Sequence, residues 1–202
     1  MPAAAFLRLP DRSRKPRLSG LTCVIDGGLP LTDVRAILDS AAASVDVWKL
    51  GWGSAYLDAA LDAKLELLRR HDVIACPGGT LLEVAAYQGR TEECLRWMAA
   101  SGFEQVEVSD GLGLLGEDAK AALIRRAATS FTVVSEVGLK RAGSVMPPAM
   151  WALDLQPGAD RMVSASSSSA CTIVNDPLLS DSCLPRHSYA CRTGPASLAG
   201  VA

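Results

Sequence analysis

Charged residues stand at or near the ends of successive short apolar runs in this sequence. Asp26 closes the first run, Lys49 lies in the second, and Glu107 lies in the fourth. Such runs are typical of parallel β-strands, whose carboxyl ends meet at the edge of the sheet where ligands bind. A buried carboxylate is costly unless it is paired or binds a metal, so these side chains need partners.

The same pattern recurs in the fifth run, where Glu136 is followed four residues later by Lys140. Acidic groups at several strand ends, together with the two lysines, could converge on one pocket that holds a divalent cation and an anionic substrate. Oxygen ligands of this kind suit Mg²⁺, which binds through one or two carboxylates, several waters and the substrate. A network of salt bridges is the structural alternative, and the number of carboxylates favours the site.

Glycine-rich turns follow the second and third runs. Glycine lets a backbone approach a ligand closely, and N–H groups at a helix start bind phosphate or carboxylate. The same turns are also the simplest connection from a strand to a helix, so both interpretations stay open. A serine shares a face with Glu107 because side chains alternate along a strand. The candidates for substrate contacts are Gly51, Gly53, Ser54, Gly78, Gly79, Thr80, Ser109 and Lys140.

Strand-like and helix-like segments alternate along the first two thirds of the chain. The predicted strands are 22–26, 45–50, 73–76, 105–109 and 132–136, and the predicted helices start at 33 and 80 or cover 55–70, 91–101 and 117–128. Thr32 is a good N-cap, and Thr80 with Glu83 resembles a capping box. Strand starts roughly 25 to 30 residues apart indicate repeated β-α units with right-handed crossovers.

Such units build either an open doubly wound sheet or a (β/α)8 barrel of the TIM type. A full barrel needs about 250 residues, and this chain has 202. We therefore predict an α/β fold with an incomplete barrel of about five to six units. The predicted organisation is an N-terminal arm (1–20), a partial barrel (21–163) and an irregular or disordered tail (164–202), where the serine-rich run 164–169 breaks the pattern.

Composition excludes several classes of function. The net charge of −2 offers no basic face for nucleic acid, and no apolar stretch approaches the roughly 20 residues that span a bilayer. The start lacks the pattern of a secretory signal. The cysteines near the end are too loosely spaced for a structural zinc site, so reduced thiols in a cytoplasmic protein are expected.

Five motifs in order resemble the phosphosulfolactate synthase family over about residues 17–140. They are Val24-Ile25-Asp26-x-Gly28, Val47-Trp48-Lys49-Leu50-Gly51-Trp52-Gly53-Ser54, Pro77-Gly78-Gly79-Thr80-Leu81-Leu82-Glu83, the stretch from Gly102-Phe103-Glu104 to Glu107-Val108-Ser109-Asp110-Gly111, and Ser135-Glu136-Val137-Gly138.

The resemblance implies a TIM-barrel lyase that adds sulfite to phosphoenolpyruvate with Mg²⁺, giving (2R)-phosphosulfolactate on a route to coenzyme M. It also covers homologues with stress-associated roles, so a non-catalytic barrel or another phosphate-handling barrel enzyme is the alternative. By position, Lys49 would stabilise the substrate anion or transfer a proton. Glu107 and Glu136 would act as acid or base or bind metal, and we assign the metal to Asp26 and Asp110.

The chain also departs from the family. Gly27 stands where members carry a lysine, Leu139 interrupts the family's Glu-Val-Gly-Lys-Lys run, and no counterpart of the last strands is visible. The abrupt change suggests a frameshifted or truncated reading frame with impaired activity. An incomplete barrel would leave open edges and an unfilled interior, so marginal stability and self-association are expected.

Overall fold

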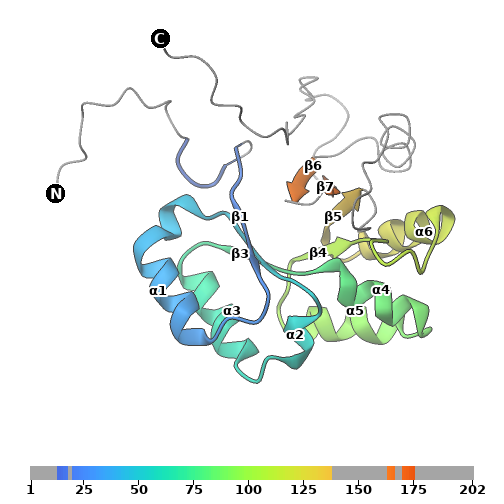
Figure 1. Ribbon diagram of the computed structural model, residues 1–202, viewed down its shortest axis with the longest axis horizontal. Coiled ribbons are helices and arrows are strands. Elements are labelled where there is room, and N and C mark those ends of the chain that lie inside the picture. Colours follow the sequence, from blue (N-terminus) through green and yellow to red (C-terminus); the bar gives the residue numbers. More distant parts are fainter. Residues whose placement is uncertain (1–12, 18–19, 138–162, 167–169, 176–202) are drawn as a thin grey trace, which may run out of the picture.

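The computed structural model describes residues 13–17, 20–137, 163–166 and 170–175 of the chain. Strands and helices alternate over most of this length (Figure 1). The elements are β1 (Cys23–Asp26), α1 (Leu31–Ala41), the 3₁₀ turn η1 (Ala42–Ser44), β2 (Val47–Leu50), α2 (Ser54–Leu57), α3 (Leu61–Arg70), β3 (Ile74–Pro77), α4 (Gly79–Tyr87), α5 (Thr91–Ala100), β4 (Gln105–Val108), α6 (Glu117–Ala127), β5 (Thr132–Val137), β6 (Val163–Ser166) and β7 (Ala170–Asn175).

The strands form two sheets. β1, β2 and β3 pair in that order and in parallel, and β4 pairs with β5 in parallel. β7 then pairs antiparallel with β5, and β6 pairs antiparallel with β7. The prediction of an α/β fold with parallel strands is confirmed, and the arrangement is consistent with part of a barrel. β6 and β7 lie in or next to the segment 164–202, which was predicted to lack regular structure. The prediction is wrong at these residues.

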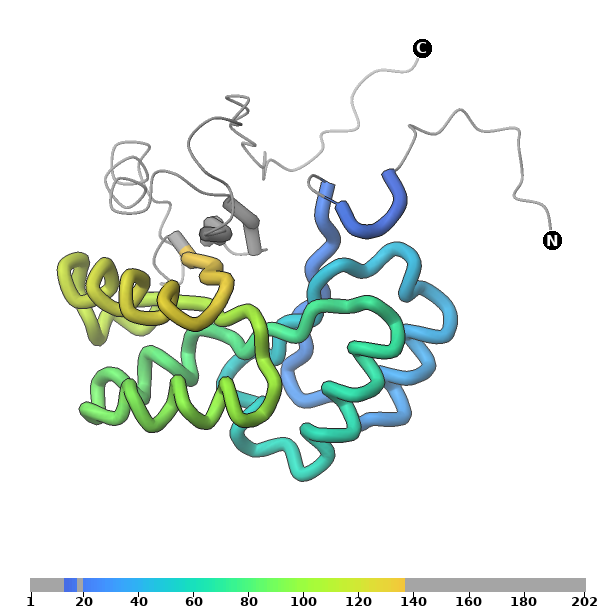
Figure 2. Tube along the Cα trace, turned by 180° about the vertical axis from the view of Figure 1, so that it is seen from behind, coloured from blue at the N-terminus to red at the C-terminus, as the bar shows by residue number. Residues whose placement is uncertain are grey.

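The helices pack on one side of the strands. Figures 1 and 2 show α1 and α3 beside the first sheet, and α4, α5 and α6 beside β4 and β5. Alternate strand residues such as Trp48, Leu50 and Val106 join the helix side chains in one hydrophobic core. The other side of the first sheet is more open, because Ile25 and Ile74 there are each 46% exposed. Parallel sheets are normally covered on both faces.

Several local predictions were wrong. The segment 55–70 forms two helices, α2 and α3. α1 begins at Leu31 after Pro30, and Thr32 gives it no side-chain cap. α4 begins after Gly78, also without a side-chain cap, and Glu83 is buried rather than turned back to the helix start. The Glu83 carboxylate therefore accepts hydrogen bonds in the interior and does not form the capping box at the helix start.

Part of the N-terminal arm is tied to the first sheet. The Arg17 guanidinium lies 2.5 Å from the Asp46 carboxylate just before β2. The Lys15 ammonium donates to the carbonyl oxygens of His71 and Asp72, just before β3. These two residues of the predicted arm therefore lie against the sheet. In the described ranges, no helix is long and apolar enough to cross a membrane.

Candidate active site on the inner side of the strands

A buried ion pair joins the second and fourth strands on the inner side of the fold, away from the helices. The Lys49 Nζ atom of β2 lies 2.8 Å from the Glu107 Oε2 atom of β4, and their side chains are only 11% and 2% exposed. The second oxygen, Glu107 Oε1, accepts a hydrogen bond of 2.9 Å from the Gly79 N–H at the start of α4. Three elements that are distant in sequence therefore meet at one carboxylate.

The charges around Lys49 keep its ammonium protonated. Burial alone would lower the pKa of Lys49, but the Glu107 carboxylate, by charge and hydrogen bond, and the nearby Glu136 carboxylate together raise it above its usual value. Glu136 of β5 is itself 1% exposed. Lys49, Glu107 and Glu136, which the sequence predicted to act together, are thus brought into one electrostatic neighbourhood.

The glycines of the predicted anion site bring the strand ends together. A Cβ atom on Gly78 would lie 3.0 Å from the Gly51 Cα atom, and one on Gly79 would lie 2.7 Å from the Ser109 Cβ atom. The N–H groups of these turns bond within the protein. Gly51 donates to the Asp26 carbonyl oxygen, and Gly78 donates to the Leu50 carbonyl oxygen. Glycine is therefore required here by close packing, and a direct ligand contact of these groups stays a prediction.

The other predicted contact residues lie at the same end of the strands. Gly53, with φ of +76°, precedes α2, and the Ser54 hydroxyl donates to the Asp26 carbonyl oxygen at 3.5 Å. Thr80 lies in the first turn of α4. The Ser109 hydroxyl donates to Glu83 Oε2 at 3.0 Å. Lys140 lies outside the described residues.

The Asp26 side chain points toward the helices and away from Lys49. In the β1–β2 register Ile25 lies beside Lys49, and Asp26 lies beside Leu50. Because neighbouring strand residues point to opposite faces, the Asp26 carboxylate lies on the helix side of the sheet. The expectation that it converges with Lys49, Glu107 and Glu136 on one pocket is therefore wrong.

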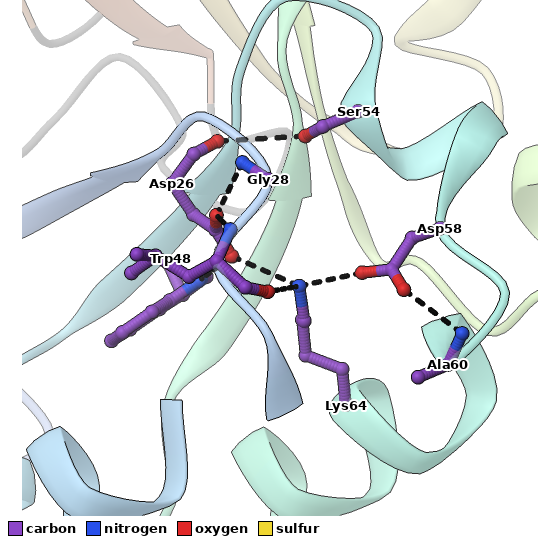
Figure 3. A network of polar contacts seen from close by, with 8 residues as sticks. Asp26, Gly28, Trp48, Ser54, Asp58, Ala60 and Lys64 are labelled. Carbon is purple, nitrogen blue, oxygen red and sulfur yellow. Dashed lines mark hydrogen bonds and ion pairs between the residues drawn. The ribbon is translucent and has the colours of Figure 1, made fainter. Parts of the chain in front are cut away.

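Four donors already satisfy the Asp26 carboxylate (Figure 3). Oδ1 accepts from the N–H groups of Gly28 at 2.7 Å and Leu29 at 2.6 Å. Oδ2 accepts from the Trp48 indole at 2.9 Å and the Lys64 ammonium at 3.2 Å. A carboxylate has about four acceptor positions, so none remains for a metal ion.

Asp110, the second predicted metal ligand, is also engaged. Its two oxygens accept from the N–H groups of Leu115 at 2.9 Å and Gly116 at 3.0 Å, which close the loop before α6. Within the part of the chain that the structure describes, no three His, Cys, Asp or Glu side chains form a group able to hold a metal ion. Asp26 and Asp110 as placed do not fit the magnesium site that the resemblance suggested.

Sequence analysis did not single out the buried lysines of α3 and α6, and it assigned a buried glutamate to a cap. Lys64 and Lys120 lie on the apolar faces of α3 and α6, and Glu83 holds the loop after β4 through Ser109 and the Leu112 N–H. Lys120 donates to the Glu136 carbonyl oxygen at 2.7 Å. The signal was available, because Lys64 is spaced with Leu61, Leu65 and Leu68 at helical intervals.

The fold and the site together define an α/β protein of barrel type whose buried lysine–carboxylate pair lies at the carboxyl ends of its strands. Comparison with known proteins agrees with this class. Residues 10–175 match the family described as (2R)-phospho-3-sulfolactate synthase (ComA). The chain belongs to this phosphosulfolactate synthase family.

Three relatives carry the name phosphosulfolactate synthase. The protein of Bacillus subtilis is 33% identical over 169 residues, which is 81% of this chain and 67% of the relative. The Methanothermobacter thermautotrophicus protein is 37% identical over 65% of this chain, and the Methanocaldococcus jannaschii protein is 38% identical over 60%. The match spans only 52% and 49% of the length of these last two relatives.

Proposed function

We propose that this protein is a phosphosulfolactate synthase-like lyase that adds sulfite to phosphoenolpyruvate and gives (2R)-phosphosulfolactate. Family membership supports the class of reaction. The observation that carries the proposal is the Lys49–Glu107 pair, buried on the inner side of the strands with Glu136 close enough to act on it. A lysine in this position meets the main demand of the reaction, which is to stabilise a growing negative charge.

The chemistry sets two demands on the site. The sulfite sulfur attacks the methylene carbon of phosphoenolpyruvate, and the electrons of the double bond move to C2 and into the carboxylate as an aci-carboxylate. A proton then adds to C2 on one face, so that a carbon–sulfur and a carbon–hydrogen bond form and no group leaves. The site must therefore supply a cation beside the substrate carboxylate and a proton donor beside C2.

Lys49 suits the first demand. An ammonium has three N–H donors, and in the described part of the chain one of them goes to Glu107. Two donors remain for the substrate carboxylate. The raised pKa of Lys49 keeps the group charged, which favours charge stabilisation over proton donation. A single well-placed donor of this kind is worth about 10²–10³ in rate.

The two carboxylates divide the remaining roles. Glu107 accepts from Lys49 and from the Gly79 N–H, so its part is to aim the ammonium rather than to exchange protons. Glu136 is our candidate for proton transfer to C2. Among the described residues, Glu107 and Glu136 are the carboxylates and Lys49 is the lysine of the inner side, so we expect an anionic substrate to need further positive charge. Asp26 and Asp110 are engaged in hydrogen bonds elsewhere, so these roles fall to side chains of the inner side.

A direct assay tests the proposal. The purified chain is incubated with phosphoenolpyruvate, sulfite and Mg²⁺, while sulfite loss and the ³¹P spectrum are followed. We expect sulfite to be consumed with a new phosphate-ester signal, and the folded Lys49→Met variant to react about 10²–10³-fold more slowly. A folded wild-type chain that consumes no sulfite would contradict the proposal and favour a non-catalytic homologue. A rise in melting temperature with another phosphorylated compound would instead favour a different phosphate-handling enzyme.

A further inference from the structure

A fully buried ammonium, that of Lys64, lies on α3 in the described part of the chain. Its side chain is 0% exposed, and three protein oxygens lie around Nζ (Figure 3). These are Asp58 Oδ2 at 2.5 Å, the Leu29 carbonyl oxygen at 2.8 Å and Asp26 Oδ2 at 3.2 Å. The contacts with Leu29 and Asp26 are hydrogen bonds and the contact with Asp58 is an ion pair, so protein oxygens enclose the ammonium.

A buried network of this kind is an expensive way to stabilise a fold. Desolvation of an ammonium and two carboxylates offsets much of their attraction, and apolar side chains of similar volume often stabilise as well or better. Such a network does, however, accept only one geometry, because each partner left unpaired is penalised. Its contribution therefore lies in fixing the segments that it joins.

Those segments are loops at the carboxyl ends of β1 and β2. Leu29 belongs to the loop between β1 and α1, and Gly28 in that loop has φ of +114°, a backbone conformation that glycine tolerates. Asp58 connects α2 to α3, and its Oδ1 atom accepts from the Ala60 N–H at 2.9 Å. The N–H of Gly51, which follows β2, donates to the Asp26 carbonyl oxygen at 2.7 Å.

We infer that Lys64 is a positioning residue, whose ammonium holds Asp26 and fixes the loops that border the active site. Its link to catalysis rests on the proposed function. Lys49 directly precedes the β2 end that Gly51 ties to Asp26, so a shift of this end moves the reactive ammonium. Displacements of about 1 Å at a site can cost on the order of a hundredfold in rate.

The first test follows the loop directly and needs no catalysis. Amide hydrogen exchange at Gly28 and Leu29 is measured by NMR in the wild type, in Lys64→Met and in Asp62→Asn. Asp62 is an exposed acidic residue of the same helix and serves as the control. In Lys64→Met we expect exchange at both amides to quicken at least tenfold more than exchange at the amides of β4, which reports the loss of global stability, and we expect no such change in Asp62→Asn. Wild-type exchange at Gly28 and Leu29 in the folded variant would overturn the inference.

The second test separates positioning from simple stabilisation. In folded Lys64→Met we expect kcat for sulfite addition to fall about 10- to 100-fold, with KM for phosphoenolpyruvate changed far less. A loss of stability alone would leave kcat per folded molecule unchanged, and that result would overturn the link to catalysis. If the wild type itself adds no sulfite, the proposed function fails, while the exchange test still decides the role of Lys64 in the loop.

Asp58→Asn provides a milder variant if Lys64→Met does not fold. It weakens one contact of the ammonium and leaves the bonds to Asp26 and Leu29 in place. We expect a smaller but measurable change in the same direction, with faster exchange at Leu29 and a several-fold lower kcat. Exchange and kcat equal to those of Asp62→Asn would overturn the inference.

Discussion

Two buried lysines lie on opposite sides of the same small sheet, and their surroundings differ. Lys49 faces the inner side, with Glu107 as its hydrogen-bond partner among the described residues and donors left over. Lys64 reaches the helix side, where an ion pair with Asp58 and hydrogen bonds to Leu29 and Asp26 enclose its ammonium. A lysine with unused donors can bind an incoming anion, whereas one enclosed by protein oxygens holds its neighbours in place. The state of the donors, rather than burial itself, separates a reactive lysine from a positioning one.

The largest effect is expected on stability at Lys64. Lys64→Met removes the counter-charge of the buried Asp26 and the partly buried Asp58, and breaking such a network costs about 3–5 kcal/mol in the free energy of unfolding. Urea unfolding measures the change, and Asp62→Asn on the same helix should stay within about 0.5 kcal/mol of the wild type. If Lys64→Met were as stable as the wild type, the proposed structural role of Lys64 would be contradicted.

The next effect is on rate at Lys49. Lys49→Met should lower kcat/KM for sulfite addition about 10²–10³-fold, because it removes the cation beside the developing charge. Its stability should suffer less than that of Lys64→Met, since Glu107 keeps the hydrogen bond from the Gly79 N–H. Steady-state kinetics measure the change, and Lys15→Met in the distant arm is the control. Activity within threefold of the control would show that Lys49 is not reactive.

A smaller effect is expected where the strand ends pack. The added methyl group of Gly79→Ala would lie 2.7 Å from the Ser109 Cβ atom and 2.9 Å from its backbone nitrogen. Overpacking of this kind costs about 1–3 kcal/mol, measured again by urea unfolding. Gly27→Ala is the matched control, because its nearest neighbour would be Trp52 at 3.9 Å. Equal stability of the two variants would mean that the close approach at Gly79 is not required.

The smallest effect is a dependence on pH that distinguishes the two sides of the sheet. Burial alone would raise the pKa of Asp26, but hydrogen bonds from Leu29, Trp48, Gly28 and Lys64 lower it below the unfolded value of about 3.9. The resulting stability is present above that value and is lost as the pH falls through the lower, folded-state pKa.

Lys49 behaves in the opposite way. Its pKa is raised in the folded chain, so its contribution is present below the unfolded value of about 10.4 and is lost as the pH rises through the folded-state pKa. Unfolding free energies measured across pH should therefore show that Asp26→Asn flattens only the acid side and Lys49→Met only the alkaline side. An unchanged acid limb in a folded Asp26→Asn chain would contradict this account.

Much of the fold followed from the sequence, because buried parallel strands are short apolar runs and helices repeat at 3.6 residues. All five predicted strands exist, with bounds that differ by one or two residues. The broken helix before β3 was missed, since Asp58 follows α2 in an extended conformation that ends it. The capping box failed at Glu83 because tertiary packing offered that carboxylate Ser109 and the Leu112 N–H.

The site was predicted only in part. Lys49, Glu107 and Glu136 lie on alternate strand positions that face inward, so the period of two placed them together. Asp26 was misplaced because it ends its strand one position after Ile25, and the face of a terminal residue depends on the register with β2. Lys64 went unnoticed because lysine is almost never fully buried unless paired, and its partners come from a loop and a strand end that only the fold brings close.

The most direct test of the contrast follows both lysines in one experiment. The chain has five lysines, so lysine-selective ¹³C labelling gives a simple spectrum in which Lys49→Met and Lys64→Met assign the two signals. Phosphoenolpyruvate is titrated in while the ¹³Cε resonances are recorded. We predict that the Lys49 signal shifts with saturation and that the Lys64 signal moves far less. A ligand that shifts Lys64 and leaves Lys49 unchanged would contradict the central claim.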